Sequence, residues 1–269
     1  TTRELGWIHE TLPLLSRLLE VQALHRTSRS LMETYLGGYT GQKVLNGSIK
    51  RGDGEDIPAV IWYCDLRGST ALADSLPRSE YLDLLNQYFE AMAGSVLAHG
   101  GEVLKFIGDG LLAIFPMDRV KAGADGQPVY CPGGKAKEGD TMFCGSDACG
   151  KAIAAARDAL NRMAEVNAAL PDRGRLPLGF GLSLHLGEVT YGNIGATSRL
   201  DFTVIGPATN EAARMDALTK ELGLGVLISE DFARFVPEGL VSVGRHAFRG
   251  VSQDREIFTL PELLPAAGD

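Results

Sequence analysis

Apolar side chains recur with helical spacing along the N-terminal part of the chain. They form a stripe within residues 7–35, and no glycine interrupts the pattern after Pro13. This spacing predicts one long helix over residues 7–35. A Gly-Gly pair at positions 37 and 38 changes the pattern, and residues 51–56 form a polar, turn-rich linker. We expect residues 1–50 to be a helical extension that connects to an upstream segment, supports dimerisation or packs on its own domain. The stripe consists of Leu12, Leu14, Leu15, Leu18, Leu19 and Val21.

The first half of the main domain is predicted to hold three strands and one helix. Residues 59–64 are short, apolar and β-prone, which favours a buried strand. Apolar residues between Tyr81 and Val96 recur at spacings of three and four, which predicts an amphipathic helix ending at a Gly-Gly pair. Two apolar runs, residues 102–107 and 111–115, flank Gly-Asp-Gly and predict a tight β-hairpin.

The second half continues with helices and short strands. A helix is predicted over residues 151–169 and another over residues 210–222. Strands are predicted at residues 178–184 and 188–192 with a turn at Leu186-Gly187, at residues 201–205, and near the C-terminus at 226–228, 240–243 and 256–260. This order of elements predicts an α+β sandwich with a mainly antiparallel sheet and flanking helices.

Residues 117–148 have no periodicity and are predicted to form a long inserted loop, which is unusual inside a compact domain. Cys131, Cys144 and Cys149 lie in or beside it, and Cys64 ends the first strand. A zinc site would need a fourth ligand such as Asp147, because no histidine lies between positions 99 and 185. Reduced thiols are the alternative interpretation.

Composition and charge narrow the function classes. The chain has 269 residues with 26 Lys and Arg against 34 Asp and Glu, so its formal net charge is −8. An acidic chain is poorly suited to nucleic-acid backbones. No apolar run is long enough to span a bilayer and no signal-peptide pattern is present, so we expect a cytoplasmic protein.

Two carboxylates are the strongest candidates for chemistry. Asp65 ends a predicted strand and Asp109 sits at the predicted hairpin tip, and two such positions can lie side by side in one sheet. Paired carboxylates suit Mg²⁺ bound together with substrate phosphates. Alternatively, both residues serve only in turns.

Three further polar residues complete the candidate set. Lys105 lies between Leu104 and Phe106; if these two face the core, Lys105 points to the opposite face. Asn210 and Arg214 are four residues apart on a predicted helix and share a face, which suits a ribose and a phosphate. Exposed polar side chains without a ligand are the alternative for all three.

Together these segments resemble the catalytic domains of class III nucleotidyl cyclases, over residues 57–260. The resemblance is carried by three motifs in order: residues 62–70 (WYCDLRGST), 101–110 (GEVLKFIGDG) and 200–215 (LDFTVIGPATNEAARM). It implies a ferredoxin-like cyclase sandwich that converts ATP to 3′,5′-cyclic AMP and pyrophosphate.

The resemblance also implies roles for individual residues. Asp65 and Asp109, with the carbonyl of Leu66, would hold two Mg²⁺ or Mn²⁺ ions, and Lys105 and Thr203 would contact the purine. Asn210 would orient the ribose, and Arg214 would stabilise charge at the pentavalent phosphorus. In this family the metals are bound by one subunit and the other residues come from its partner, so the resemblance implies a homodimer.

Two features leave alternatives open. Many members have Asp where this chain has Thr203; Thr resembles the class IIIb branch, in which adenine is still the base and a bicarbonate response has been described. Lys105 favours adenine, but guanylate cyclase activity or a non-catalytic regulatory role is still possible on sequence grounds. Arg249, and less strongly Arg199, are candidates for contacts with the triphosphate. An upstream regulatory domain and bicarbonate are candidate activators.

Overall fold

A computed structural model describes residues 2–117, 119–121, 141–143, 145–171, 175–236, 238–248 and 254–264. Its centre is an eight-stranded sheet with the order β2-β3-β1-β6-β8-β10-β9, and β7 pairs with the far part of β6. All pairs in this sheet are antiparallel except β6 with β8. The strands are β1 (Gly54–Leu66), β2 (Glu102–Ile107), β3 (Gly110–Pro116), β6 (Phe180–Ala196), β7 (Arg199–Ile205), β8 (Val226–Ser229), β9 (Val241–His246) and β10 (Arg255–Thr259).

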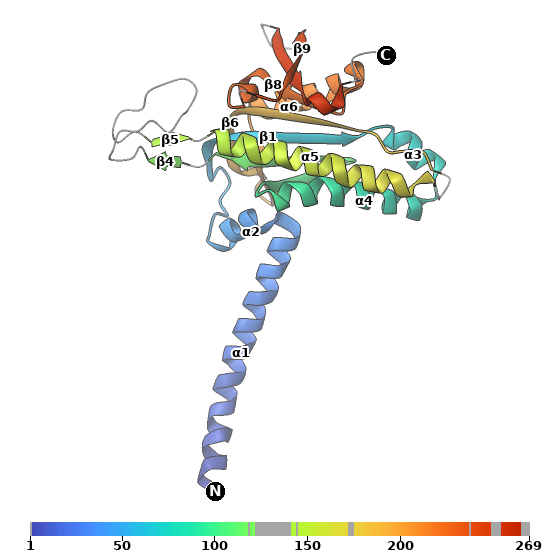
Figure 1. Ribbon diagram of the computed structural model, residues 1–269. Helices are drawn as coiled ribbons and strands as arrows, with labels where there is room; N and C mark the ends of the chain where they lie inside the picture. The colour runs from blue at the N-terminus through green and yellow to red at the C-terminus, as the bar shows by residue number, and fades with distance from the viewer. Residues whose placement is uncertain are drawn as a thin grey trace.

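Two long helices cover one face of the sheet. Alternate β1 side chains such as Trp62 and Leu66 point to this face, where they join the largest buried apolar cluster. The helices α4 (Arg78–Ala98) and α5 (Gly145–Ala169) supply the other side of that cluster. Figure 1 shows these two helices running side by side along the sheet. This face is therefore closed by packing and leaves the opposite face for the site.

The opposite face is covered only in part. The helix α6 (Pro207–Leu222) and the β6–β7 hairpin pack on it through a smaller buried cluster that includes Ile61, Leu112 and Phe202. Shorter helices complete the domain: α3 (Ser69–Ser75), α7 (Glu230–Ala233) and a 3₁₀ turn at Pro261–Leu263. The fold is the α+β sandwich that the sequence predicts.

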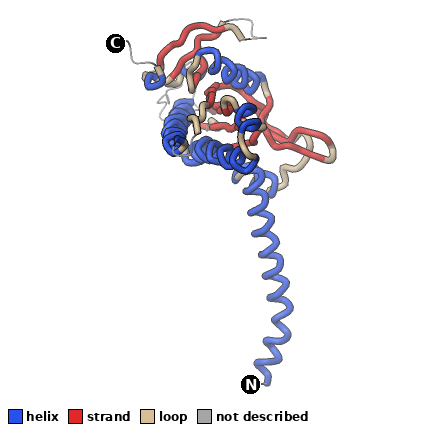
Figure 2. The backbone as a smooth tube through the Cα atoms, turned by 90° about the vertical axis from the view of Figure 1, so that its right-hand side faces the viewer, coloured by secondary structure: helices blue, strands red, loops and turns tan. Residues whose placement is uncertain are grey.

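The N-terminal extension is one long helix followed by a short one. The helix α1 (Thr2–Leu36) projects away from the domain in both views (Figures 1 and 2), and α2 (Gly38–Leu45) returns to the domain. The predicted apolar stripe on α1 is exposed to solvent: Leu14 is 67% exposed and Leu18 is 63% exposed. No helix among the described residues is long and apolar enough to cross a membrane.

A buried carboxylate fastens α2 to the sheet. Glu102 of β2 accepts hydrogen bonds from the backbone N–H of Thr40 (3.0 Å) and from its hydroxyl (2.6 Å). The hydroxyl of Tyr191 in β6 lies 2.8 Å from both oxygens of Glu102. All three residues are buried, so one carboxylate connects α2, β2 and β6.

Glu102→Ala should therefore lower the free energy of unfolding by about 3 kcal/mol, because it leaves three buried donors without their acceptor. Tyr191→Phe, which removes a single hydroxyl, should cost about 1 kcal/mol. Urea titration followed by circular dichroism measures both values. Equal losses for the two variants would contradict this assignment of Glu102 as the shared acceptor.

Three expectations about the elements are wrong in detail. Residues 180–196 form one continuous strand, without the predicted turn at Leu186-Gly187. Gly187 instead allows α6 to approach, since a Cβ there would lie 2.5 Å from the Cβ of Ala208. The helix predicted from residue 151 begins at Gly145. Within the predicted inserted loop, residues 119–121 and 141–143 form two short antiparallel strands, β4 (Arg119–Lys121) and β5 (Thr141–Phe143), and residues 145–148 belong to α5.

Candidate active site

Two acidic side chains come together at one end of the central strands. Asp65 stands near the end of β1, and Asp109 lies in the turn between β2 and β3. The register pairs Asp65 with Gly110, and the N–H of Leu66 donates to the carbonyl of Asp109 over 3.3 Å. Burial, followed by the charge of Asp109, raises the pKa of Asp65. The predicted convergence of the two carboxylates is present within one chain.

This pair suits a divalent cation on chemical grounds. Two partly buried carboxylates repel each other, and a cation between them would offset that repulsion. The described residues contain no group of three or more His, Cys, Asp or Glu side chains that could hold a metal ion. Further ligands would therefore be backbone carbonyls such as that of Leu66, water and substrate phosphates.

Lys105 reaches a partner on another strand. A bulge between Val103 and Lys105 shifts the β2–β3 register at this point. Because of this shift, Leu104 and Phe106 do not share one core: Leu104 joins the smaller cluster, while Phe106 contacts Phe89 of α4. The Nζ atom of Lys105 lies 2.9 Å from Oδ2 of Asp201 in β7. Asp201 was not singled out from the sequence.

Thr203 lies two residues beyond Asp201 on the same strand. It is buried, and its hydroxyl has no hydrogen-bond partner among the described residues. A buried hydroxyl without a partner is costly, so a bound ligand that supplies one would be favoured. The two residues predicted to contact a purine, Lys105 and Thr203, are thus connected through β7.

Asn210 and Arg214 lie on the outer side of α6. Both are exposed, whereas Ala212 and Asp216 of the same helix are buried against the sheet. Within the described part of the chain, neither Asn210 nor Arg214 makes a side-chain hydrogen bond or ion pair. One chain therefore presents the acidic pair and this polar helix face separately, and does not bring them into contact.

Comparison with known proteins finds relatives that are similar in sequence. No family model matches the chain. An adenylate cyclase of Anabaena cylindrica is 30% identical over 175 residues, which is 65% of this chain and 30% of that protein. An uncharacterised protein of Mycobacterium tuberculosis is 32% identical over 232 residues, 84% of this chain and 37% of that protein. The chain thus spans about a third of the length of these relatives.

Comparison with solved structures shows the fold. A bacterial light-regulated adenylyl cyclase matches 96% of this chain and 66% of its own, with a TM-score of 0.69 and 23% identity. The guanylyl cyclase Cya2 matches 77% of this chain and 93% of its own, with a TM-score of 0.60 and 27% identity. The chain has the class III nucleotidyl cyclase catalytic fold.

A third acid of this domain, Asp216, was missed by sequence analysis. It lies two residues after Arg214 on the buried side of α6, and its Oδ1 atom has no partner among the described residues. Burial, and then the charge of Asp65, raise the pKa of Asp216 to about 7. The 3.6-residue period of α6 turns Asp216 toward the sheet and Arg214 away from it.

Asp216→Asn should stabilise the metal-free protein at pH 8. The folded-state pKa of Asp216 is raised above its unfolded value, so ionisation costs stability as the pH rises from about 4 toward 7. The amide avoids this cost, and we expect a gain of about 1–3 kcal/mol at pH 8 that disappears near pH 4. Thermal unfolding across this pH range, in buffer containing a chelator, measures the difference. A gain that is constant with pH would contradict this interpretation.

The structure describes only some of the other residues singled out from the sequence. Arg249, Cys131 and Cys144 lie outside the described residues. Arg199 is exposed at the start of β7. Cys149 is buried in α5, and burial raises the pKa of its thiol to about 12. The thiol of Cys64 is also buried, with its pKa raised to about 12.

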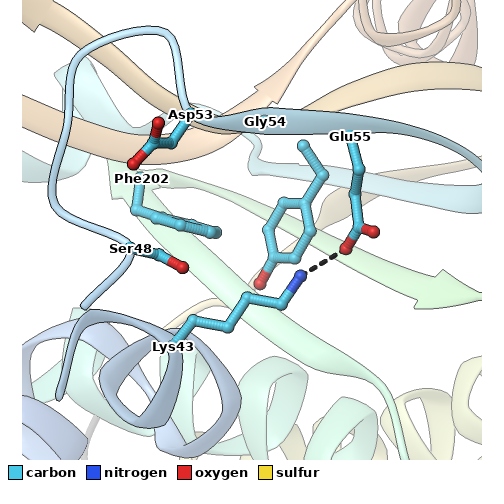
Figure 3. Close-up of a pocket in the computed structure, with 7 residues that line it drawn as sticks. Lys43, Ser48, Asp53, Gly54, Glu55 and Phe202 are labelled. Atoms are coloured by element: carbon cyan, nitrogen blue, oxygen red, sulfur yellow. Dashed lines mark hydrogen bonds and ion pairs between the residues drawn. The ribbon is translucent and has the colours of Figure 1, made fainter. Parts of the chain in front are cut away.

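A separate pocket lies where the N-terminal extension meets the main domain. Figure 3 shows Lys43 of α2 forming an ion pair with Glu55 of β1, close to Phe202. The ammonium also lies 5.1 Å from the ring centroid of Tyr191. The Lys43 ammonium is therefore already paired with Glu55 and close to an aromatic ring. None of the predicted active-site residues lines this pocket.

Proposed function

We propose that this chain is the catalytic domain of an adenylate cyclase that converts ATP to 3′,5′-cyclic AMP and pyrophosphate. The observation that carries the proposal is the convergence of Asp65 and Asp109 at one end of the central strands. The ion pair between Lys105 and Asp201 of β7 supports it, because it connects Lys105 to the strand that carries Thr203, and both residues are proposed to contact the purine. The adenylate cyclase from Anabaena and the cyclase structures support the same reaction class.

The reaction forms one bond to phosphorus and breaks another, and the proton of the 3′-hydroxyl is released to solvent. The 3′-oxygen of ATP attacks the α-phosphorus, the bond from that phosphorus to the bridging oxygen breaks, and pyrophosphate leaves. Asp65 and Asp109 would hold two Mg²⁺ or Mn²⁺ ions, which when bound lower the pKa of the 3′-hydroxyl and neutralise polyphosphate charge. Asn210 would orient the ribose, and Arg214 would neutralise charge that grows in the transition state.

Base selection is proposed to favour adenine. The Lys105 ammonium can only donate hydrogen bonds, whereas the Thr203 hydroxyl can donate or accept. Adenine offers a ring-nitrogen acceptor and an amino donor, and these two side chains can satisfy both. Guanylate cyclase activity is the second candidate, supported by the 27% identity to the guanylyl cyclase Cya2.

The active sites are proposed to form between two copies of the chain. Asn210 and Arg214 face outward without partners among the described residues, so a second copy could receive them beside its own acidic pair. The exposed apolar stripe on α1 supports association of two chains, because such a stripe is stabilised by burial against another. A link from this helix to an upstream regulatory domain is part of the proposal, and bicarbonate is its candidate small-molecule activator.

Competition between nucleotides tests the function directly. Equal concentrations of ATP and GTP are supplied together with Mn²⁺, and the cyclic products are identified by mass spectrometry. Cyclic AMP as the main product is expected. Mainly cyclic GMP would favour the second candidate, and nucleotide binding without any cyclic product would indicate a regulatory domain without turnover.

A further inference from the structure

One cation lies against the acidic pair and has no part in the proposed reaction. Lys220 stands in the last turn of α6, and its Nζ atom lies 3.5 Å from Oδ2 of Asp65. Its charge counteracts the effects of burial and of Asp109 on the pKa of Asp65. Among the described residues, it makes the one ion pair to either carboxylate of the pair.

The groups around Lys220 are mainly acidic. Asp65, Asp109 and Asp216 all lie near one another, and the phenol of Tyr63 is a further neighbour. The nearby Arg67 is committed elsewhere: its Nη2 atom donates to the carbonyls of Thr219 (2.8 Å) and Leu224 (2.6 Å). Lys220 is therefore the cation placed to balance Asp65.

This cation can leave without disturbing the fold. The Lys220 side chain is 51% exposed, whereas that of Asp65 is 25% exposed. Lysine has a flexible four-carbon stem and a strongly hydrated ammonium group, so it can turn into solvent at small cost. Asp65 has no such freedom, because its backbone is paired with β3 on one side and β6 on the other.

We propose that Lys220 is the resident counter-ion of the metal site. It neutralises Asp65 when no divalent cation is bound, and it must move away when one binds. An ammonium and a divalent cation bound to the same carboxylate repel each other. Metal binding must therefore break the Lys220–Asp65 ion pair, and the free energy lost with this pair opposes binding. Lys220 thereby lowers the affinity for divalent cations and makes it depend on ionic strength. This inference rests on the proposed metal-binding role of Asp65 and Asp109.

The test measures Mn²⁺ binding to the full chain without nucleotide, by electron paramagnetic resonance of free Mn²⁺. Lys220→Gln should bind Mn²⁺ about three- to tenfold more tightly than the unaltered chain. Lys220→Arg retains the charge and should stay within about twofold. Lys151→Gln is the matched control, since Lys151 is 46% exposed and forms an i,i+4 ion pair with Asp147 on α5. It should leave the affinity unchanged.

A second readout is thermal unfolding. Lys220→Gln should lower the melting temperature of the metal-free protein, because the acids lose their counter-ion, and saturating Mn²⁺ should raise it by more than in the unaltered chain. If the unaltered chain binds Mn²⁺ and Asp65→Asn abolishes this, but Lys220→Gln changes neither affinity nor melting, the counter-ion role is overturned. If Asp65→Asn leaves Mn²⁺ binding intact, the proposed metal site itself fails.

Discussion

Asp65→Asn and Asp109→Asn should each lower kcat for cyclic AMP formation by at least about a thousandfold. Each change keeps the side-chain shape but removes a negatively charged oxygen ligand, and the register places both side chains at one point. The loss should persist at saturating Mn²⁺, because Asp216, although it lies near the pair, does not complete a group of three side chains among the described residues that could hold a metal ion. Initial rates with purified protein measure the effect.

Asp74→Asn is the matched control for this pair. Asp74 is an exposed acid on α3, a few residues from Asp65 along the chain, and it should be replaceable without loss of rate. Circular dichroism should show that all three variants are folded. Metal-dependent activity near the unaltered rate in Asp65→Asn would remove the basis of the two-metal proposal.

Arg214→Ala is expected to show the second largest effect. It should lower kcat by about a hundredfold to a thousandfold and change KM for ATP by no more than about threefold. The reason is that the proposed contact of Arg214 strengthens as charge develops at the phosphorus, and so contributes little to binding the ground state. Substrate saturation curves separate the two constants.

Arg234→Ala provides the comparison for Arg214. Arg234 is an exposed arginine paired with Glu230 and Asp231 on α7, away from the proposed site. Its removal should leave both constants unchanged. An Arg214→Ala variant with raised KM and normal kcat would instead place this guanidinium in ground-state binding.

Most of the fold could be predicted because the apolar pattern follows local rules. The short apolar run in β1 comes from burial on both faces of the sheet, and the three-and-four spacing in α4 comes from burial on one face, so both are visible in the sequence. The turn expected at Gly187 was wrong because glycine there serves close packing with Ala208, and that contact spans distant segments. The short helix α2 was not predicted, since it is held by Glu102, which is distant in sequence.

Some residues of the candidate site could likewise be predicted from the sequence, and others could not. Asp65, Asp109 and Lys105 each lie within a short motif of consecutive residues, so they could be identified from the sequence. Asp201 was not identified from the sequence, because its ion pair with Lys105 depends on the bulge in β2 and on the position of β7. The positions of Asp216 and Lys220 near Asp65 depend on which side of α6 packs against β1. The sequence pattern of α6 does not specify that β1 is its neighbour.

The central claim is that each site combines the acids of one chain with the α6 residues of another. Mixing inactive Asp65→Asn protein with inactive Arg214→Ala protein tests this most directly, after subunit exchange is allowed. In a mixed dimer, one site receives both altered residues and the other receives neither. The account predicts recovery to about a quarter of unaltered activity, since about half of the dimers are mixed and each has one intact site. No recovery in dimers shown to be mixed would contradict it, because sites contained within single chains stay broken in both partners.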